Sequence, residues 1–144
     1  MQVNIINKSK FNNPEYATKG AAGMDLRANI TEPLILKKGE RVLIPTGVCI
    51  ELLEGYEAQI RARSGLALKH GITVLNGIGT IDGDYRAEIG VILINTDKNF
   101  DYTIYPNDKI AQLIVARFER VEWNNVDKLT ETERGGGGFG HTGK

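Results

Sequence analysis

The stretch Arg41–Ala62, RVLIPTGVCIELLEGYEAQIRA, decides the fold class of this 144-residue chain. Its segments Arg41–Pro45, Gly47–Leu52 and Tyr56–Ala62 carry the β-branched residues and the alternating pattern of half-buried strands. Between the last two lies Glu54-Gly55, a pair typical of a tight turn. Short strands in such close succession predict a β-sandwich or a jelly roll.

The same pattern continues on both sides of this stretch. Further strands are expected at Val3–Asn7, Leu34–Leu36, Ala87–Asn95, Tyr102–Ile104 and Lys109–Phe118. Turn residues recur at Lys38-Gly39, Asn76-Gly77 and Pro106-Asn107-Asp108. The length suits one core. We therefore expect a single all-β domain.

One short helix and a polar tail complete the expected organisation. Ser64 can cap a helix whose turns span Leu66–His70 and which ends at Gly71. From Asn124 the chain becomes polar and then ends in a glycine run, which has too little apolar surface to fold by itself. We divide the chain into a domain at 1–123 and a linker with a flexible arm at 124–144.

Composition restricts the partners and the compartment. The 18 basic and 18 acidic residues cancel, so no overall field attracts nucleic acid or an anionic membrane. The single cysteine, Cys49, suits a reducing compartment, and its surroundings indicate a buried hydrophobe. No apolar run is long enough to cross a bilayer. These features predict a cytoplasmic protein without direct nucleic-acid binding.

Two segments could hold a nucleotide. In Arg61–Leu66, Ser64 at a helix start and Arg63 could bind an anion, although an ordinary helix cap explains the same residues. In Asn76–Arg86, the Asp82-Gly83 pair is a strong hairpin signal. The free main-chain groups of such a hairpin could pair with a pyrimidine, while Asp82 could deprotonate a water. Tyr85 could exclude a 2′-hydroxyl or simply belong to the core.

A third segment, Ala21–Ala28, is a candidate metal site. Its alternation places Asp25 and Arg27 on one face, where they could form an ordinary surface ion pair. A lone aspartate also suits Mg²⁺, which takes one or two carboxylates together with substrate phosphates. His70 and His141 have no companions at ligand spacing, so no zinc site is expected.

The terminal segment Arg134–Lys144 allows three interpretations. It could be a flexible tail, a single Arg-Gly-Gly contact to RNA, or a lid whose glycine amides wrap phosphates. It lacks the residue order of a Walker-type phosphate loop.

Taken together, these segments resemble a known family. The order and composition of five of them are similar to the motifs of the trimeric dUTPase family: Ala21–Ala28, Arg63–Ala67, Asn76–Val91, Asp108–Val115 and Arg134–Gly143. The resemblance implies a distorted jelly-roll subunit in a homotrimer with active sites shared between subunits. It also implies hydrolysis of dUTP to dUMP and pyrophosphate with Mg²⁺, which limits uracil in DNA and supplies dUMP for dTMP synthesis.

The resemblance also implies roles for individual residues. Asp82 matches the water-activating carboxylate, and Asp25 matches the aspartate that holds Mg²⁺, through water. Tyr85 matches the tyrosine that discriminates against ribose. The remaining implied substrate contacts are Arg63, Ser64, Gly65, Asn76, Gly79, Thr80, Ile81, Gly90, Gln112, Arg134, Phe139 and Gly140.

Departures from the family pattern bear on the phosphate contacts. Lys109 stands where arginine is usual, which argues against a bidentate contact, and His141 replaces a serine of the arm. Ala87 replaces a glycine without an expected effect.

Two alternatives share the fold: a dCTP deaminase, which needs an acid/base glutamate, and a non-catalytic regulatory module. For the deaminase, the nearby glutamate Glu88 lies on the wrong side of Tyr85. Loss of Asp82 would favour the regulatory module, but Asp82 is present.

Overall fold

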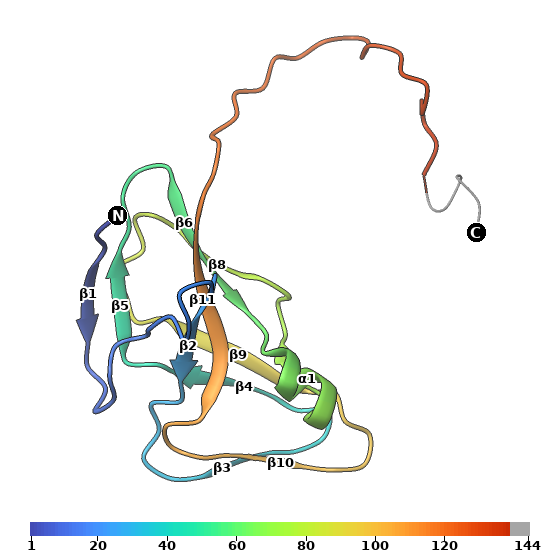
Figure 1. Ribbon diagram of the computed structural model, residues 1–144. Coiled ribbons are helices and arrows are strands. Elements are labelled where there is room, and N and C mark those ends of the chain that lie inside the picture. The colour runs from blue at the N-terminus through green and yellow to red at the C-terminus, as the bar shows by residue number, and fades with distance from the viewer. Residues whose placement is uncertain (139–144) are drawn as a thin grey trace.

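The chain forms an all-β body from which its C-terminal segment departs (Figure 1). The computed structural model describes residues 1–138. Its elements are β1 (Asn4–Asn7), β2 (Met24–Arg27), β3 (Leu34–Leu36), β4 (Arg41–Pro45), β5 (Val48–Glu51), β6 (Tyr56–Arg61), α1 (Ser64–His70), β7 (Ile72–Val74), β8 (Gly79–Ile81), β9 (Gly90–Asn95), β10 (Tyr102–Ile104) and β11 (Lys109–Arg117).

Two larger sheets and two strand pairs make up the body. The larger sheets have the strand orders β2-β11-β6-β8 and β4-β9-β7, and the pairs are β1-β5 and β10-β3. All pairings are antiparallel. Alternating side chains from both larger sheets, such as Ile60 of β6 and Leu93 of β9, belong to one buried cluster. Burial of each such aliphatic side chain contributes about 1.5–3 kcal/mol. The expected jelly-roll class is confirmed.

Three strands escaped the sequence analysis or were only hinted at. β2 corresponds to the alternation noticed around Asp25, while β7 and β8, which have three residues each, were not predicted as strands. The Asp82-Gly83 turn forms, since Tyr85 N–H donates to the Asp82 carbonyl at 3.1 Å. The strands beside it do not form the expected hairpin, because β8 pairs with β6 whereas β9 pairs with β4 and β7.

The short helix lies where the sequence placed it, but its cap differs. Arg63 occupies the N-cap position with extended backbone, Ser64 is the first helical residue, and no side chain caps the helix. The expectation that Ser64 caps α1 was therefore wrong by one residue. Gly71 ends the helix in the left-handed region, at φ 63°, as expected.

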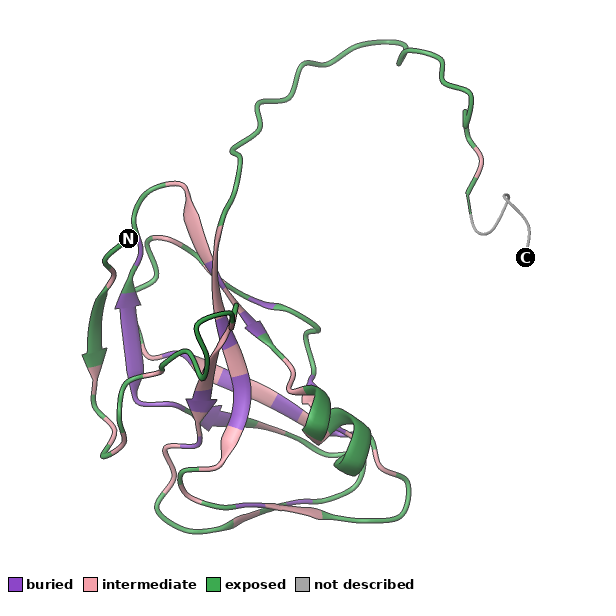
Figure 2. Ribbon diagram, in the orientation of Figure 1, coloured by how far each residue is buried: buried purple, intermediate pink, exposed green. Residues whose placement is uncertain are grey.

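The segment after β11 leaves the body as an extended, exposed arc (Figures 1 and 2). Between β11 and residue 138 no helix or strand forms, and Trp123 and Leu129 are 88% and 80% exposed. Among residues 1–138, no helix has the length and apolar character needed to cross a membrane.

Candidate active site

An ion cluster forms where β2, β11 and the start of α1 meet. The register of β11 places Gln112 opposite Asp25 of β2 on one side and opposite Arg61 of β6 on the other. Because Arg63 follows the end of β6, its guanidinium reaches the same face. Arg63 Nε donates to Asp25 Oδ1 at 3.1 Å, and Lys109 Nζ lies 2.8 Å from Asp25 Oδ2.

Arg63 also ties this cluster to the backbone. Its Nη1 donates to the Lys109 carbonyl at 3.1 Å, so the guanidinium bridges β2 and β11. The Asp25 side chain is 15% exposed, and those of Arg63 and Lys109 are 32% and 39% exposed. The sequence-level alternative, an ion pair between Asp25 and Arg27, is replaced by these two partners.

The Asp25 carboxyl has a perturbed pKa. Burial raises this pKa, but the hydrogen bond from Lys109 and the positive charges of Arg63 and Lys109 outweigh burial, and the net pKa is lowered. Asp25 is therefore ionised at neutral pH, as a partner of a hard cation must be.

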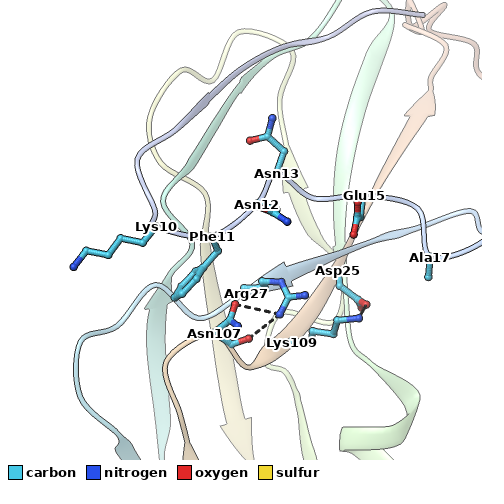
Figure 3. A pocket seen from close by; sticks show the side chains of 10 residues that line it. All are labelled: Lys10, Phe11, Asn12, Asn13, Glu15, Ala17, Asp25, Arg27, Asn107 and Lys109. Carbon is cyan, nitrogen blue, oxygen red and sulfur yellow. Dashed lines mark hydrogen bonds and ion pairs between the residues drawn. The ribbon is translucent and has the colours of Figure 1, made fainter.

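A polar cavity of about 280 Å³ adjoins this cluster, between the Lys10–Ala17 segment and the ends of β2 and β11 (Figure 3). Asp25, Arg27 and Lys109 line it, which confirms that Asp25 and Arg27 share a face. Arg27 Nη1 donates to the carbonyl and to Oδ1 of Asn107, both at 3.1 Å. Asn107 has φ 72°, a left-handed conformation that asparagine tolerates in tight turns.

A second cavity, of about 320 Å³, lies beside β8. The predicted site residues that line it are Thr80, Ile81, Asp82, Tyr85 and Gly90, and its other lining residues are Leu43, Glu88 and Ile92. The Asp82 side chain is exposed at its rim. Four predicted residues of the segment 80–85 thus line the same cavity as Gly90, the first residue of β9.

The wall of this cavity is fixed by the loop between β8 and β9. Tyr85 Oη donates to the Glu88 carbonyl at 3.0 Å, and the tyrosine remains 42% exposed. The Glu88 carboxylate accepts from Gly47 N–H at 2.7 Å. Glu88 is therefore a structural anchor of the loop, which argues against the acid/base glutamate of a deaminase.

Gly79 and Asn76 adjoin each other at the start of β8. A Cβ on Gly79 would lie 3.2 Å from Ile60 Cβ and 3.3 Å from Asn76 Nδ2, so glycine permits this close packing.

Beside the Asp25 cluster, a Cβ on Gly65 would meet nothing within 4 Å, and Ser64 is exposed. Both residues border open space at the start of α1.

The arm residue Arg134 contacts neither the Asp25 cluster nor the residues that line the β8 cavity. Its Nε donates to the Gly137 carbonyl at 2.9 Å, within a turn of the exposed terminal segment. Within residues 1–138 no hydrogen bond or ion pair connects the Asp25 cluster, the β8 cavity and Arg134. Phe139 and Gly140, also predicted as site residues, lie outside the described residues.

The chain is similar to known proteins over its whole length. A family model described as dUTPase matches residues 9–143. The chain belongs to the dUTPase family. Two relatives named deoxyuridine 5′-triphosphate nucleotidohydrolase are 52% identical over 144 residues (Fusobacterium nucleatum) and 53% identical over 143 residues (Finegoldia magna). These alignments cover 100% and 99% of this chain and 98% and 99% of the relatives.

Solved dUTPase structures share the fold. A mutant of the phage 80alpha dUTPase superimposes with a TM-score of 0.87 at 25% identity, covering 97% of this chain and 98% of that chain. The 80alpha dUTPase with dUpNHpp gives 0.85 at 23% identity, covering 99% of each. A mutant dUTPase of Staphylococcus aureus phage phi11, described with a structural Mg(II) ion, gives 0.79 at 23%, covering 89% and 98%.

Sequence analysis of this dUTPase missed one member of the ion cluster. Lys109 was noticed only as a departure from the family pattern, and its contact with Asp25 was not foreseen. Only the pairing of β2 with β11 brings together two residues 84 positions apart, and no local signal encodes that register.

Proposed function

We propose that this dUTPase hydrolyses dUTP to dUMP and pyrophosphate through a water that Asp82 activates, with Mg²⁺ carried on the triphosphate. Family membership makes the chain a dUTP diphosphatase. The names of its relatives support the substrate, and a related phage enzyme is described with the analogue dUpNHpp. The mechanism, the metal and the assembly are the parts that we propose.

The observation that carries the mechanism is the β8 cavity. The Asp82 carboxylate, Tyr85 and part of β8 surround one space, and Asp82 is exposed to solvent. A general base must lie within hydrogen-bond reach of the proton that it accepts. In the proposed reaction, Asp82 takes a proton from water, the water oxygen bonds to the α-phosphorus, and the bond to the bridging oxygen breaks. Pyrophosphate keeps that oxygen and its electron pair.

The position of β8 in its sheet supports recognition of the base by main-chain groups. β8 lies at the end of the order β2-β11-β6-β8, so its outer edge pairs with no other strand within residues 1–138. The proposed uracil contacts are the main chain of Gly79–Ile81 and the Asn76 amide. Cytosine presents an amino group where uracil presents O4, and each polar group left unmatched would cost about 1–3 kcal/mol. Thymine would be refused for want of space for its methyl group.

Tyr85 and Gly90 are proposed to shape the sugar subsite. The hydrogen bond from Tyr85 Oη to the Glu88 carbonyl orients the ring at the cavity wall. A Cβ on Gly90 would come within 2.6 Å of a methyl carbon of Leu43, so glycine at this position allows Leu43 to pack closely against β9 in the cavity wall. A ring fixed in this way could exclude a 2′-hydroxyl.

The phosphates are proposed to lie along the Asp25 cluster. Arg63, Ser64 and Gly65 border the open start of α1, and Gln112 lies opposite Asp25. Catalysis of phosphoryl transfer consists mainly of positioning and charge neutralisation, for which these donors are suited.

The Asp25 carboxylate fits an Mg²⁺ that it contacts through water. It is ionised, and each of its oxygens has one cationic partner, which leaves further lone pairs for a water. Within residues 1–138, no group of three His, Cys, Asp or Glu residues could hold a metal alone. When bound, Mg²⁺ neutralises charge on the phosphate oxygens.

A complete site is proposed to require a homotrimer. Within residues 1–138, no hydrogen bond or ion pair links the Asp25 cluster, the β8 cavity and Arg134, and residues of other copies are proposed to unite them. We propose that residues 1–123 form the catalytic body and that 124–144 cover a site formed by other subunits. There Arg134 would meet the γ-phosphate, Gly140 would approach the phosphates, and Phe139 would cover the uracil. Covering the site would exclude water.

The proposed cellular role follows from the reaction. Removal of dUTP limits uracil incorporation into DNA, and the dUMP formed can supply dTMP synthesis. The cytoplasm is the proposed location, on the basis of the lone cysteine.

Pyrophosphate release from dUTP, dTTP, dCTP and UTP, measured with and without Mg²⁺, tests the function. We expect release from dUTP alone, with dependence on Mg²⁺. Release of ammonia from dCTP is the signature of a deaminase and would overturn the proposal. Equal turnover of UTP and dUTP would refute the role of Tyr85.

A further inference from the structure

Lys109 contacts Asp25 because of an irregularity in β11. The register between β2 and β11 shifts between Lys109 and Ala111, so that Arg27 pairs with Lys109 whereas Leu26 pairs with Ala111. The extra residue, Ile110, is buried in the core at 2% exposure. A regular register would have placed position 110 opposite Arg27. The bulge instead brings Lys109 to the face of Asp25, and bulges beside active sites commonly redirect a side chain in this way.

Both oxygens of Asp25 consequently have a cationic partner. Arg63 Nε lies 3.1 Å from Oδ1, and Lys109 Nζ lies 2.8 Å from Oδ2. One carboxylate with two cations has a formal charge of plus one. The other charged residues that line the adjoining cavity are Lys10, Glu15 and Arg27. Because two of these three are cations, they add a further positive charge and no excess negative charge.

We propose that Lys109 is a positioning residue that holds Asp25 and keeps it from binding a free divalent cation, so that the metal enters only with the triphosphate. This inference rests on the proposed function and concerns the order in which its components bind. A cluster with excess positive charge repels a bare divalent ion. The same cluster attracts a metal–nucleotide complex, whose phosphates make it negative overall.

Mn²⁺ binding to the full-length enzyme without nucleotide tests this inference. Free Mn²⁺ is measured by electron paramagnetic resonance for wild type, Lys109→Gln, Lys109→Met and Lys109→Arg. Glutamine keeps a hydrogen-bond donor and removes the charge, methionine removes both, and arginine keeps the charge. Lys98→Met, in the exposed turn between β9 and β10, removes a cation elsewhere and serves as the matched control.

The two uncharged variants are expected to bind Mn²⁺ about tenfold more tightly than wild type at low ionic strength. This is the Coulomb effect of a unit charge on a divalent ion about 6 Å away in water. The gain should shrink with added salt. Lys109→Arg and Lys98→Met should match wild type. Adding Asp25→Asn to Lys109→Gln should abolish the gain, which would assign it to that carboxylate.

Unchanged Mn²⁺ affinity in both uncharged variants would overturn the inference, as would a gain that survives in the double variant. If Lys109→Met does not fold, the glutamine and arginine variants still decide the matter. The failure of the proposed function is a separate result, namely no pyrophosphate release from dUTP by wild type, which the Mn²⁺ titration does not measure.

Discussion

Replacement of Asp82 by asparagine should separate catalysis from folding. The Asp82 side chain is exposed at the rim of the β8 cavity and makes no hydrogen bond within residues 1–138. Its main-chain carbonyl accepts from Tyr85 N–H at 3.1 Å, and asparagine is equally suited to that turn position. Asp82→Asn therefore keeps the turn and removes only the proposed proton acceptor.

The two expected magnitudes differ widely. A surface substitution of this kind changes the free energy of unfolding by at most about 0.5 kcal/mol. Loss of a general base lowers kcat by about 10² to 10⁴, which corresponds to a rise of about 3–5 kcal/mol in the activation barrier. Because the proposed base would contact water and not the nucleotide, KM should change by less than about threefold.

Steady-state pyrophosphate release from dUTP gives kcat and KM, and urea denaturation gives the free energy of unfolding. Glu54→Gln is the matched control, since Glu54 is an exposed carboxylate that, together with Asp82, lines a further cavity beside the turn between β5 and β6. It should retain wild-type kcat. A kcat of Asp82→Asn above a tenth of the wild-type value would refute the role of Asp82, as would an equal loss in the control.

Three further predictions concern the arm, the ion cluster and the backbone. A chain ending at Glu133 should lose more than about nine-tenths of its kcat through loss of lid closure, yet sediment as the same oligomer; dissociation would contradict the proposed role of the arm. Asp25→Asn should destabilise the protein by about 1–3 kcal/mol at neutral pH. The pKa of Asp25 is lowered in the folded protein from its ordinary 3.8. The extra stability of wild type over Asp25→Asn should therefore be complete above pH 3.8 and be lost as the pH falls through the pKa of Asp25 in the folded protein. Urea denaturation at pH 7, 4 and 3 checks this trend. Gly47→Ala should lower the free energy of unfolding by about 2 kcal/mol more than Gly39→Ala. Both glycines have positive φ, but only at Gly47 would a Cβ clash, at 2.7 Å from Ser9 N. Equal urea midpoints for the two variants would disprove this.

The sequence by itself determined the fold class and grouped five of the residues that line the β8 cavity, namely Thr80, Ile81, Asp82, Tyr85 and Gly90. Strands such as Arg41–Pro45 and Tyr102–Ile104 have the predicted bounds because alternation is a local property of a half-buried strand. Thr80, Ile81, Asp82 and Tyr85 surround one cavity because a tight turn keeps neighbours in sequence close in space.

Only the tertiary structure decided the ion cluster. Its members Asp25, Arg63 and Lys109 belong to segments distant in the sequence. Their contacts depend on strand register and on a bulge, which are set by burial of residues such as Ile110 across the whole sheet. Residue patterns within a segment report which face is buried, whereas packing between segments selects which charges meet.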